Sequence, residues 1–101
     1  MSDVLLSLTM PPSMIQDIED LLLAHPTLVP GFTTSQANGH GSAVHLVEPG
    51  ELVRGHAPRV QVRLVGPPDN MQAVLALIRE HYPRANIFYW IVPVIESGRI
   101  V

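Results

Sequence analysis

Apolar and polar residues alternate in the first segment of the chain. Over Val4–Met10 every second side chain is valine, leucine or methionine, and Ser7 and Thr9 stand among the positions between them. A period of two residues places the apolar side chains on one face, so the segment is predicted to be a half-buried strand. Pro11 and Pro12 are expected to end it, because proline has no N–H for a sheet hydrogen bond.

The next segment changes to the helical period. Its apolar residues recur every three or four positions, and they are Met14, Ile15, Ile18, Leu21 and Leu22. Ser13 with Gln16 three residues later is a capping-box pattern, which predicts that the helix begins at Ser13. The helix is expected to end near His25, because Pro26 disfavours helical geometry in the residue before it.

The same two patterns recur in the rest of the chain. Alternation predicts a strand over residues 60–64. Residues 32–37, which are rich in threonine and serine and lie between two glycines, suit another strand, and the apolar residues 86–94 are predicted to be the last one. An apolar helical face over residues 71–82 predicts a second helix, for which Asp69 with Gln72 repeats the capping pattern.

The order of the predicted elements indicates a fold class. Strand, helix and strand occur twice, which is typical of a single ferredoxin-like, split βαβ domain over residues 1–101, with a four-stranded antiparallel sheet and both helices on one face. Residues 87–92 of the last strand are apolar without alternation. Strands of this kind are usually covered on both sides. We therefore expect the open face or edge of the sheet to be buried between subunits.

A long segment, residues 39–58, separates the two halves. Connections of about this length are uncommon in compact domains unless they have a function. It contains three histidines and two glutamates: His40, His45, Glu48, Glu51 and His56. Nitrogen and oxygen donors of this kind suit zinc, copper, nickel or cobalt. We expect a metal site drawn from His40, His45, Glu48 and His56; ordinary solvated side chains are the alternative, because the spacing matches no closed site.

The composition excludes several classes of protein. The chain has no cysteine, hence no disulfide, thiolate metal site or cysteine nucleophile. Its net charge is −3 and its six basic residues are dispersed arginines, so nucleic-acid binding is not expected. The sequence has no signal-peptide pattern and no apolar run that could span a bilayer, and we expect a cytoplasmic protein. No common catalytic or phosphate-binding motif is present, so we do not expect an enzyme.

Three segments resemble the PII signalling proteins. Residues 31–41 resemble the second PII strand, with Gly39-His40-Gly41 in place of the glycine-aromatic-glycine step at the base of the T-loop. Residues 60–78 are similar to the strand, turn and helix after that loop, and residues 87–96 resemble the PII ending, Val-Pro-Val-Glu. The trimeric CutA proteins share this architecture. The nearest resemblance is to a short PII-like group of proteobacteria whose genes often lie beside heavy-metal efflux systems.

The resemblance implies a homotrimeric regulator with ligand clefts between subunits. Residues 39–58 take the T-loop position, and the implied cleft residues are Gly39, His40, Gly41, Glu96 and Arg99. The implied partner is a membrane metal-efflux transporter. A CutA-like metal buffer and an adenine-nucleotide signalling module are the alternatives. Against the latter, residues 81–86 lack the glycines and lysine of the PII phosphate-binding B-loop.

Overall fold

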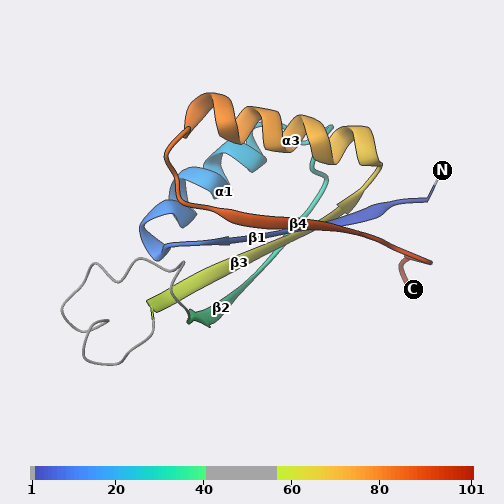
Figure 1. The fold of residues 1–101 in the computed structure, drawn as a ribbon. Coiled ribbons are helices and arrows are strands. Elements are labelled where there is room, and N and C mark those ends of the chain that lie inside the picture. The colour runs from blue at the N-terminus through green and yellow to red at the C-terminus, as the bar shows by residue number, and fades with distance from the viewer. Residues whose placement is uncertain (1, 41–56) are drawn as a thin grey trace.

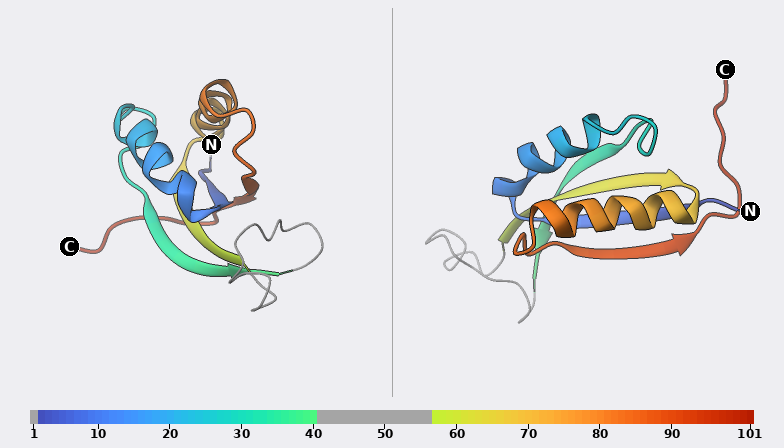
Figure 2. Two further views of the ribbon diagram at one scale, coloured as in Figure 1. Left: turned by 90° about the vertical axis from the view of Figure 1, so that its left-hand side faces the viewer. Right: turned by 90° about the horizontal axis from the view of Figure 1, so that it is seen from above.

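The computed structural model describes residues 2–40 and 57–101. Its elements are β1 (Val4–Met10), a 3₁₀ turn η1 (Pro12–Met14), α1 (Ile15–Leu23), β2 (Thr33–Gly39), β3 (Ala57–Gly66), α3 (Pro68–His81) and β4 (Phe88–Pro93). The four strands form one antiparallel sheet in the order β2-β3-β1-β4. Both helices cover the same face of this sheet (Figures 1 and 2). The predicted ferredoxin-like α+β fold is confirmed.

The core lies between the sheet and the helices. Leu6 and Leu8 of β1 are opposite Leu64 and Val62 of β3, and all four side chains are buried. The helices add a second set of buried side chains, which are Ile18, Leu22, Met71, Val74, Leu75 and Ile78. Burying a side chain of this size contributes roughly 1.5–3 kcal/mol. This layer is therefore the main source of stability. No helix in the described part of the chain has the length and apolar character needed to cross a membrane.

Prolines, rather than side-chain caps, stand at the helix starts. Ser13 lies inside η1, and Met14, the residue that precedes α1, makes no side-chain cap hydrogen bond. At α3 the cap position is Pro67, with a second proline at the first helical position. Proline suits that position because its fixed φ is already helical and its missing N–H would have no partner in the helix. Both predicted capping boxes are wrong. The Gln16 amide instead donates to Asp20 Oδ1 at 2.9 Å.

The strands β2 and β3 continue beyond the end of β1. The last residue of β1, Met10, pairs with Val60. Further along, β2 and β3 pair only with each other, as far as Gly39 opposite Ala57. The residues at both ends of the predicted loop 39–58 therefore lie in strands. The sequence pattern missed this because β2 is a largely exposed edge strand and shows no apolar alternation.

The last strand begins later than predicted. Asn86 was expected at its first position, but this residue has φ of 56°, which is left-handed geometry and incompatible with a strand. Asparagine tolerates this conformation better than other residues with a Cβ atom. Asn86 therefore ends the turn after α3, and β4 starts at Phe88.

This geometry predicts the effect of substituting Asn86. Asn86→Val should lower the free energy of unfolding by about 1–2 kcal/mol, because a β-branched side chain is strained at positive φ. Asn86→Gly removes the same polar side chain without that strain and should be close to neutral. Urea unfolding of both variants at one protein concentration measures the difference; equal stabilities would show that the backbone geometry at Asn86 is unimportant.

Candidate functional site

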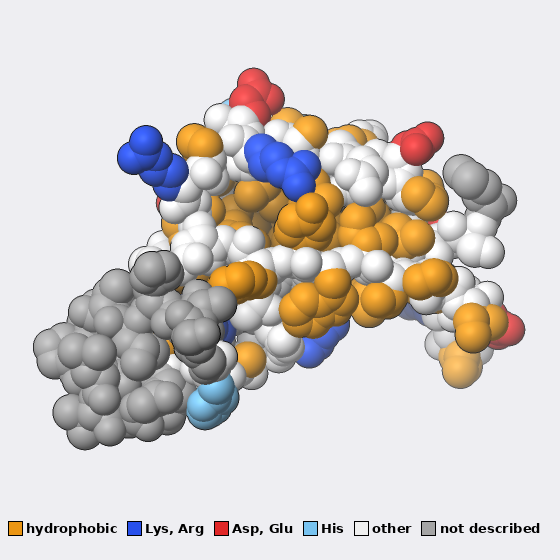
Figure 3. Space-filling model, viewed as in Figure 1, with side chains coloured by type: hydrophobic (Ala, Val, Ile, Leu, Met, Phe, Trp, Pro, Cys, Tyr) orange, Lys and Arg blue, Asp and Glu red, His pale blue; other side chains and the backbone are white. Residues whose placement is uncertain are grey.

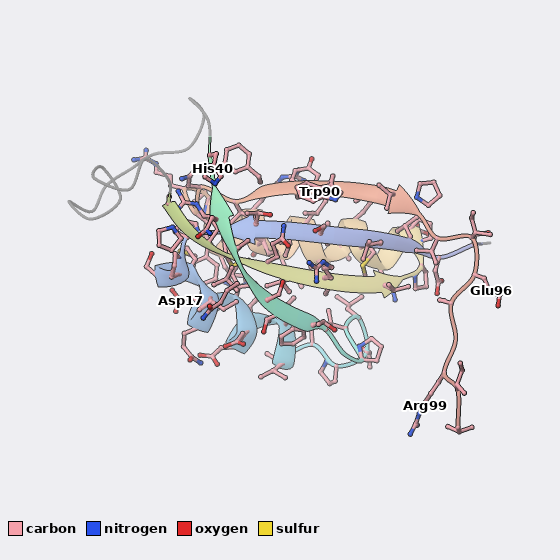
Figure 4. All side chains as sticks on the ribbon, turned by 90° about the horizontal axis from the view of Figure 1, so that it is seen from below. Asp17, His40, Trp90, Glu96 and Arg99 are labelled. Atoms are coloured by element: carbon pink, nitrogen blue, oxygen red, sulfur yellow. The ribbon has the colours of Figure 1, made fainter. Side chains whose placement is uncertain are left out.

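A hollow lies on the open face of the sheet, at the end where β2 and β3 run on past β1. Its volume is about 400 Å³, and all four strands contribute to its lining. The lining residues are Thr9, Ala37, Asn38, His40, Arg59, Gln61, Phe88, Tyr89 and Trp90. Figure 4 shows this face, with His40 at the end of β2 and Trp90 on β4.

The strand register brings these residues together. Thr9 on β1 is opposite both Gln61 on β3 and Phe88 on β4, and Ala37 on β2 is opposite Arg59. Side chains of residues directly opposite each other point to the same face of a sheet. Because Leu8 and Met10 are in the core, Thr9 and the residues opposite it belong to the open face. The hollow is therefore a direct consequence of the same alternation that builds the core.

Arg59 supplies a permanent positive charge to the hollow. The residue is only 5% exposed, and its Nη1 donates to the carbonyl oxygen of Pro58 at 2.7 Å. A guanidinium group has five N–H donors in a planar fork that matches carboxylate and phosphate oxygens. On chemical grounds this part of the hollow suits an anionic group.

Thr9 adds a polar atom that the protein does not satisfy. Among the described residues, its Oγ1 is the one buried side-chain oxygen or nitrogen with no hydrogen-bond partner. A buried group left without a partner costs about 1–3 kcal/mol. Such a group in the lining of a hollow is an observation that favours a binding site, because a bound molecule could supply the partner.

Aromatic rings form the wall of the hollow on the β4 side. Phe88 and Trp90 are 41% and 47% exposed, although both are large apolar side chains. Tyr89 points to the opposite face of β4, where Nη2 of Arg79 donates to its hydroxyl at 3.0 Å and the guanidinium lies 5.5 Å from its ring centre. A second hollow of about 210 Å³ lies on that side, next to α3 and Asn86.

The structure separates the predicted cleft residues into two groups. Gly39 ends β2 and His40 follows it at the rim of the hollow. Glu96 and Arg99 lie beyond the end of β4, at the opposite end of the sheet (Figure 4). One chain by itself therefore does not bring the two groups together.

Most of the predicted metal ligands lie outside the described residues. This applies to His45, Glu48 and His56, and also to Gly41 of the predicted cleft. Within residues 2–40 and 57–101, no group of three or more histidines and carboxylates could hold a metal ion. His40 is thus the one predicted ligand whose position is known.

Thr9, Arg59 and Gln61 were not singled out from the sequence. Arg59 and Gln61 alternate along β3 with the same period as Arg63, whose Nη2 donates to Gln61 Oε1 at 2.8 Å. The strand was predicted over residues 60–64. Extending it by one residue toward the N-terminus would have placed Arg59 on the open face of the sheet. No sequence signal could have shown that Thr9 Oγ1 is buried without a partner, because this depends on packing between strands.

Comparison with known proteins agrees with the observed fold. A family model described as "Protein of unknown function (DUF3240)" matches residues 1–101. The 2.40 Å crystal structure of a DUF3240 family protein from Shewanella baltica has a TM-score of 0.71 at 22% sequence identity, covering 100% of this chain and 99% of that chain. A candidate PII-like signaling protein from Thermus thermophilus has a TM-score of 0.63 at 12% identity, covering 93% and 91%. No curated protein matches the sequence.

The unsatisfied hydroxyl predicts a stabilising substitution. Thr9→Val keeps the shape and β-branching of the side chain and removes the oxygen, so it should raise the free energy of unfolding by about 1 kcal/mol. Thr9→Ser keeps the hydroxyl and should give no such gain. Urea unfolding without ligand, at a fixed protein concentration, makes the comparison. If Thr9→Val is no more stable than the unsubstituted protein, the hydroxyl has a partner in solution.

Proposed function

We propose that this chain, which belongs to the DUF3240 family over its whole length, is a PII-like regulatory protein. In this proposal a small ligand binds at the hollow, and the segment between β2 and β3 reports its presence to a partner protein. The main support is the position of the hollow: His40 and Arg59 line it, and both lie where the two strands lead into that segment. A ligand held there would favour some conformations of the segment over others, which is the requirement for a switch.

The proposed protein acts as a homotrimer with its ligand sites between copies. His40 lies at one end of the sheet, while Glu96 and Arg99 lie at the other. A cleft that contains all three can form only where one end of a copy meets the opposite end of the next. Head-to-tail contacts of this kind form closed rings when the rotation allows. The exposed aromatic rings of β4 also favour a covered surface in the assembly.

The first proposed ligand is a transition-metal ion, either zinc, copper, nickel or cobalt. His40 provides an imidazole at the rim, and His45, Glu48 and His56 follow in the adjoining segment. Imidazole and carboxylate are ligands that these ions prefer. We further propose that the partner is a component of a membrane metal-efflux system, which follows from the family resemblance. The proposed role is signalling without catalysis.

An adenine nucleotide is the second candidate ligand. Arg59 favours it, because a buried guanidinium repels a metal ion and attracts phosphate oxygens. The rings of Phe88 and Trp90 beside it offer a surface on which a base could stack. The absence of a glycine-rich segment at residues 81–86 weighs against the binding mode of other PII proteins.

Calorimetric titration of metal-free protein separates the two ligands. Zinc, copper, nickel and cobalt chlorides and, in parallel, ATP and AMP are the titrants. If a metal binds, we expect His40→Ala combined with His45→Ala to weaken its affinity about tenfold or more, ~1.4 kcal/mol. His81→Ala, which removes an exposed histidine at the end of α3, should leave it unchanged.

The nucleotide arm has its own matched pair of variants. If ATP or AMP binds, Arg59→Gln should abolish the heat of binding, while Arg84→Gln, on the exposed turn after α3, should not. Metal affinity that survives the double histidine substitution would exclude this metal site. Pull-down from membranes with and without the metal then tests the regulatory role; a metal-binding protein that captures no partner in either condition would be a buffer.

Light scattering coupled to size-exclusion chromatography tests the assembly. One chain has a mass of 11.1 kDa, and we expect a species of about three times that mass at micromolar concentration. A monomer throughout this range would contradict the homotrimer.

A further inference from the structure

The helix-side hollow, which lies between α3 and β4, has an apolar floor. Leu8, Leu75 and Ile78 form this floor, and all three are core side chains with an exposed fraction of 6% or less. In the view of Figure 3, hydrophobic side chains fill the space between α3 and β4, and a basic side chain lies over them. The hollow therefore combines an apolar interior with a charged rim.

The helix-side hollow has room for one ring. Its volume is about 210 Å³, and an apolar cavity of about 150 Å³ is sufficient to hold benzene. The remaining space lies at the rim, where a short polar group could be accommodated. Tyr82 and Tyr89 also line the hollow, and aromatic rings pack favourably against another ring in offset or edge-to-face geometry.

A guanidinium group without a counter-ion lies at the rim. Arg79 is an exposed residue of α3 that lines the hollow. Its Nη2 donates to the Tyr89 hydroxyl at 3.0 Å, and its guanidinium carbon lies 5.5 Å from the centre of the Tyr89 ring. Among residues 2–40 and 57–101 these are the polar contacts of its side chain, and neither involves a carboxylate. Most of the five N–H donors of the group remain available.

The contacts with Tyr89 prepare Arg79 to bind an anion. Ordering a long exposed side chain normally reduces binding affinity, and the ring and hydroxyl of Tyr89 already hold the guanidinium in one place. The same hollow also borders the last turn of α3, where the helix dipole is negative and disfavours an anion. The charge of Arg79 is therefore essential for any anion that binds here.

We infer that the helix-side hollow binds a small aromatic carboxylate, with the ring on Leu75 and Ile78 and the carboxylate on Arg79. The planar fork of a guanidinium group matches the two oxygens of a carboxylate. A nucleotide needs a larger pocket than this one. The inference does not depend on the ligand proposed above, because His40 and Arg59 line the other hollow, on the open face of the sheet.

Titration with phenylacetate, which has one ring and one carboxylate, tests the inference. We expect saturable shifts of the amide NMR signals of Ala85, Asn86 and Ile87, with a dissociation constant of ~1 mM or lower. Ala37 and Gln61, which line the hollow on the open face, should not shift. No saturable shift up to about 10 mM would overturn the inference, and so would shifts confined to Ala37 and Gln61.

Two simpler probes separate the ring from the charge. Acetate provides the carboxylate alone, and benzyl alcohol provides the ring without a charge. Each should bind about tenfold more weakly than phenylacetate, or worse. If either binds as tightly as phenylacetate, the hollow does not recognise the two groups together, and the assignment of an aromatic carboxylate is wrong.

Substitution of Arg79 tests its role. Arg79→Gln should weaken the binding of phenylacetate about tenfold or more, and Arg79→Lys, which keeps the charge without the planar fork, should fall between the two. Arg84→Gln removes an exposed arginine outside this hollow and should leave the affinity unchanged. The amide spectrum without ligand checks the fold of each variant. Equal affinities of Arg79→Gln and Arg84→Gln would overturn the assignment of the carboxylate to Arg79.

A larger side chain at Ala85 provides an independent test. Ala85 lines the hollow and is partly exposed, so Ala85→Leu should narrow the space for the ring and leave the core unchanged. We expect this variant to lose phenylacetate binding although Arg79 is present. Unchanged affinity would show that the ring does not enter the hollow.

Discussion

The register between the two central strands is the constraint on which the rest of the structure depends. It sets Leu6 opposite Leu64 and Leu8 opposite Val62, under both helices. A slip of one residue would move the apolar set of one strand to the other face of the sheet. The same register places Thr9 opposite Gln61 and, through β4, opposite Phe88. The core and the hollow therefore lie on the two faces of one strand pairing.

The site lies where this pairing ends. β1 ends at Met10, and the ribbon of β2 and β3 runs on without a third strand, so its side chains border an open hollow. Here the structure places groups that the core could not accept. Arg59 carries a charge, and Thr9 keeps a buried hydroxyl without a partner. The unsatisfied hydroxyl of Thr9 costs stability, and it distinguishes the hollow from a gap in the packing.

The two layers leave one face of the sheet uncovered. With helices on one side only, Phe88 and Trp90 of β4 are exposed on the open face in a single chain. This uncovered face is the surface that the proposed assembly would bury.

The sequence by itself determined the fold, because alternation in β1 and β3 and the helical periods of α1 and α3 each follow from burial of one face. It also placed His40 close to the end of the predicted second strand. Only the tertiary structure decided the rest. The extent of β2 depends on β3 rather than on its own pattern, the helix starts follow from proline geometry, and Asn86 displaces the start of β4. The site combines Thr9, Arg59 and Phe88 from three strands far apart in the chain, and such proximity arises from register, which no local pattern encodes.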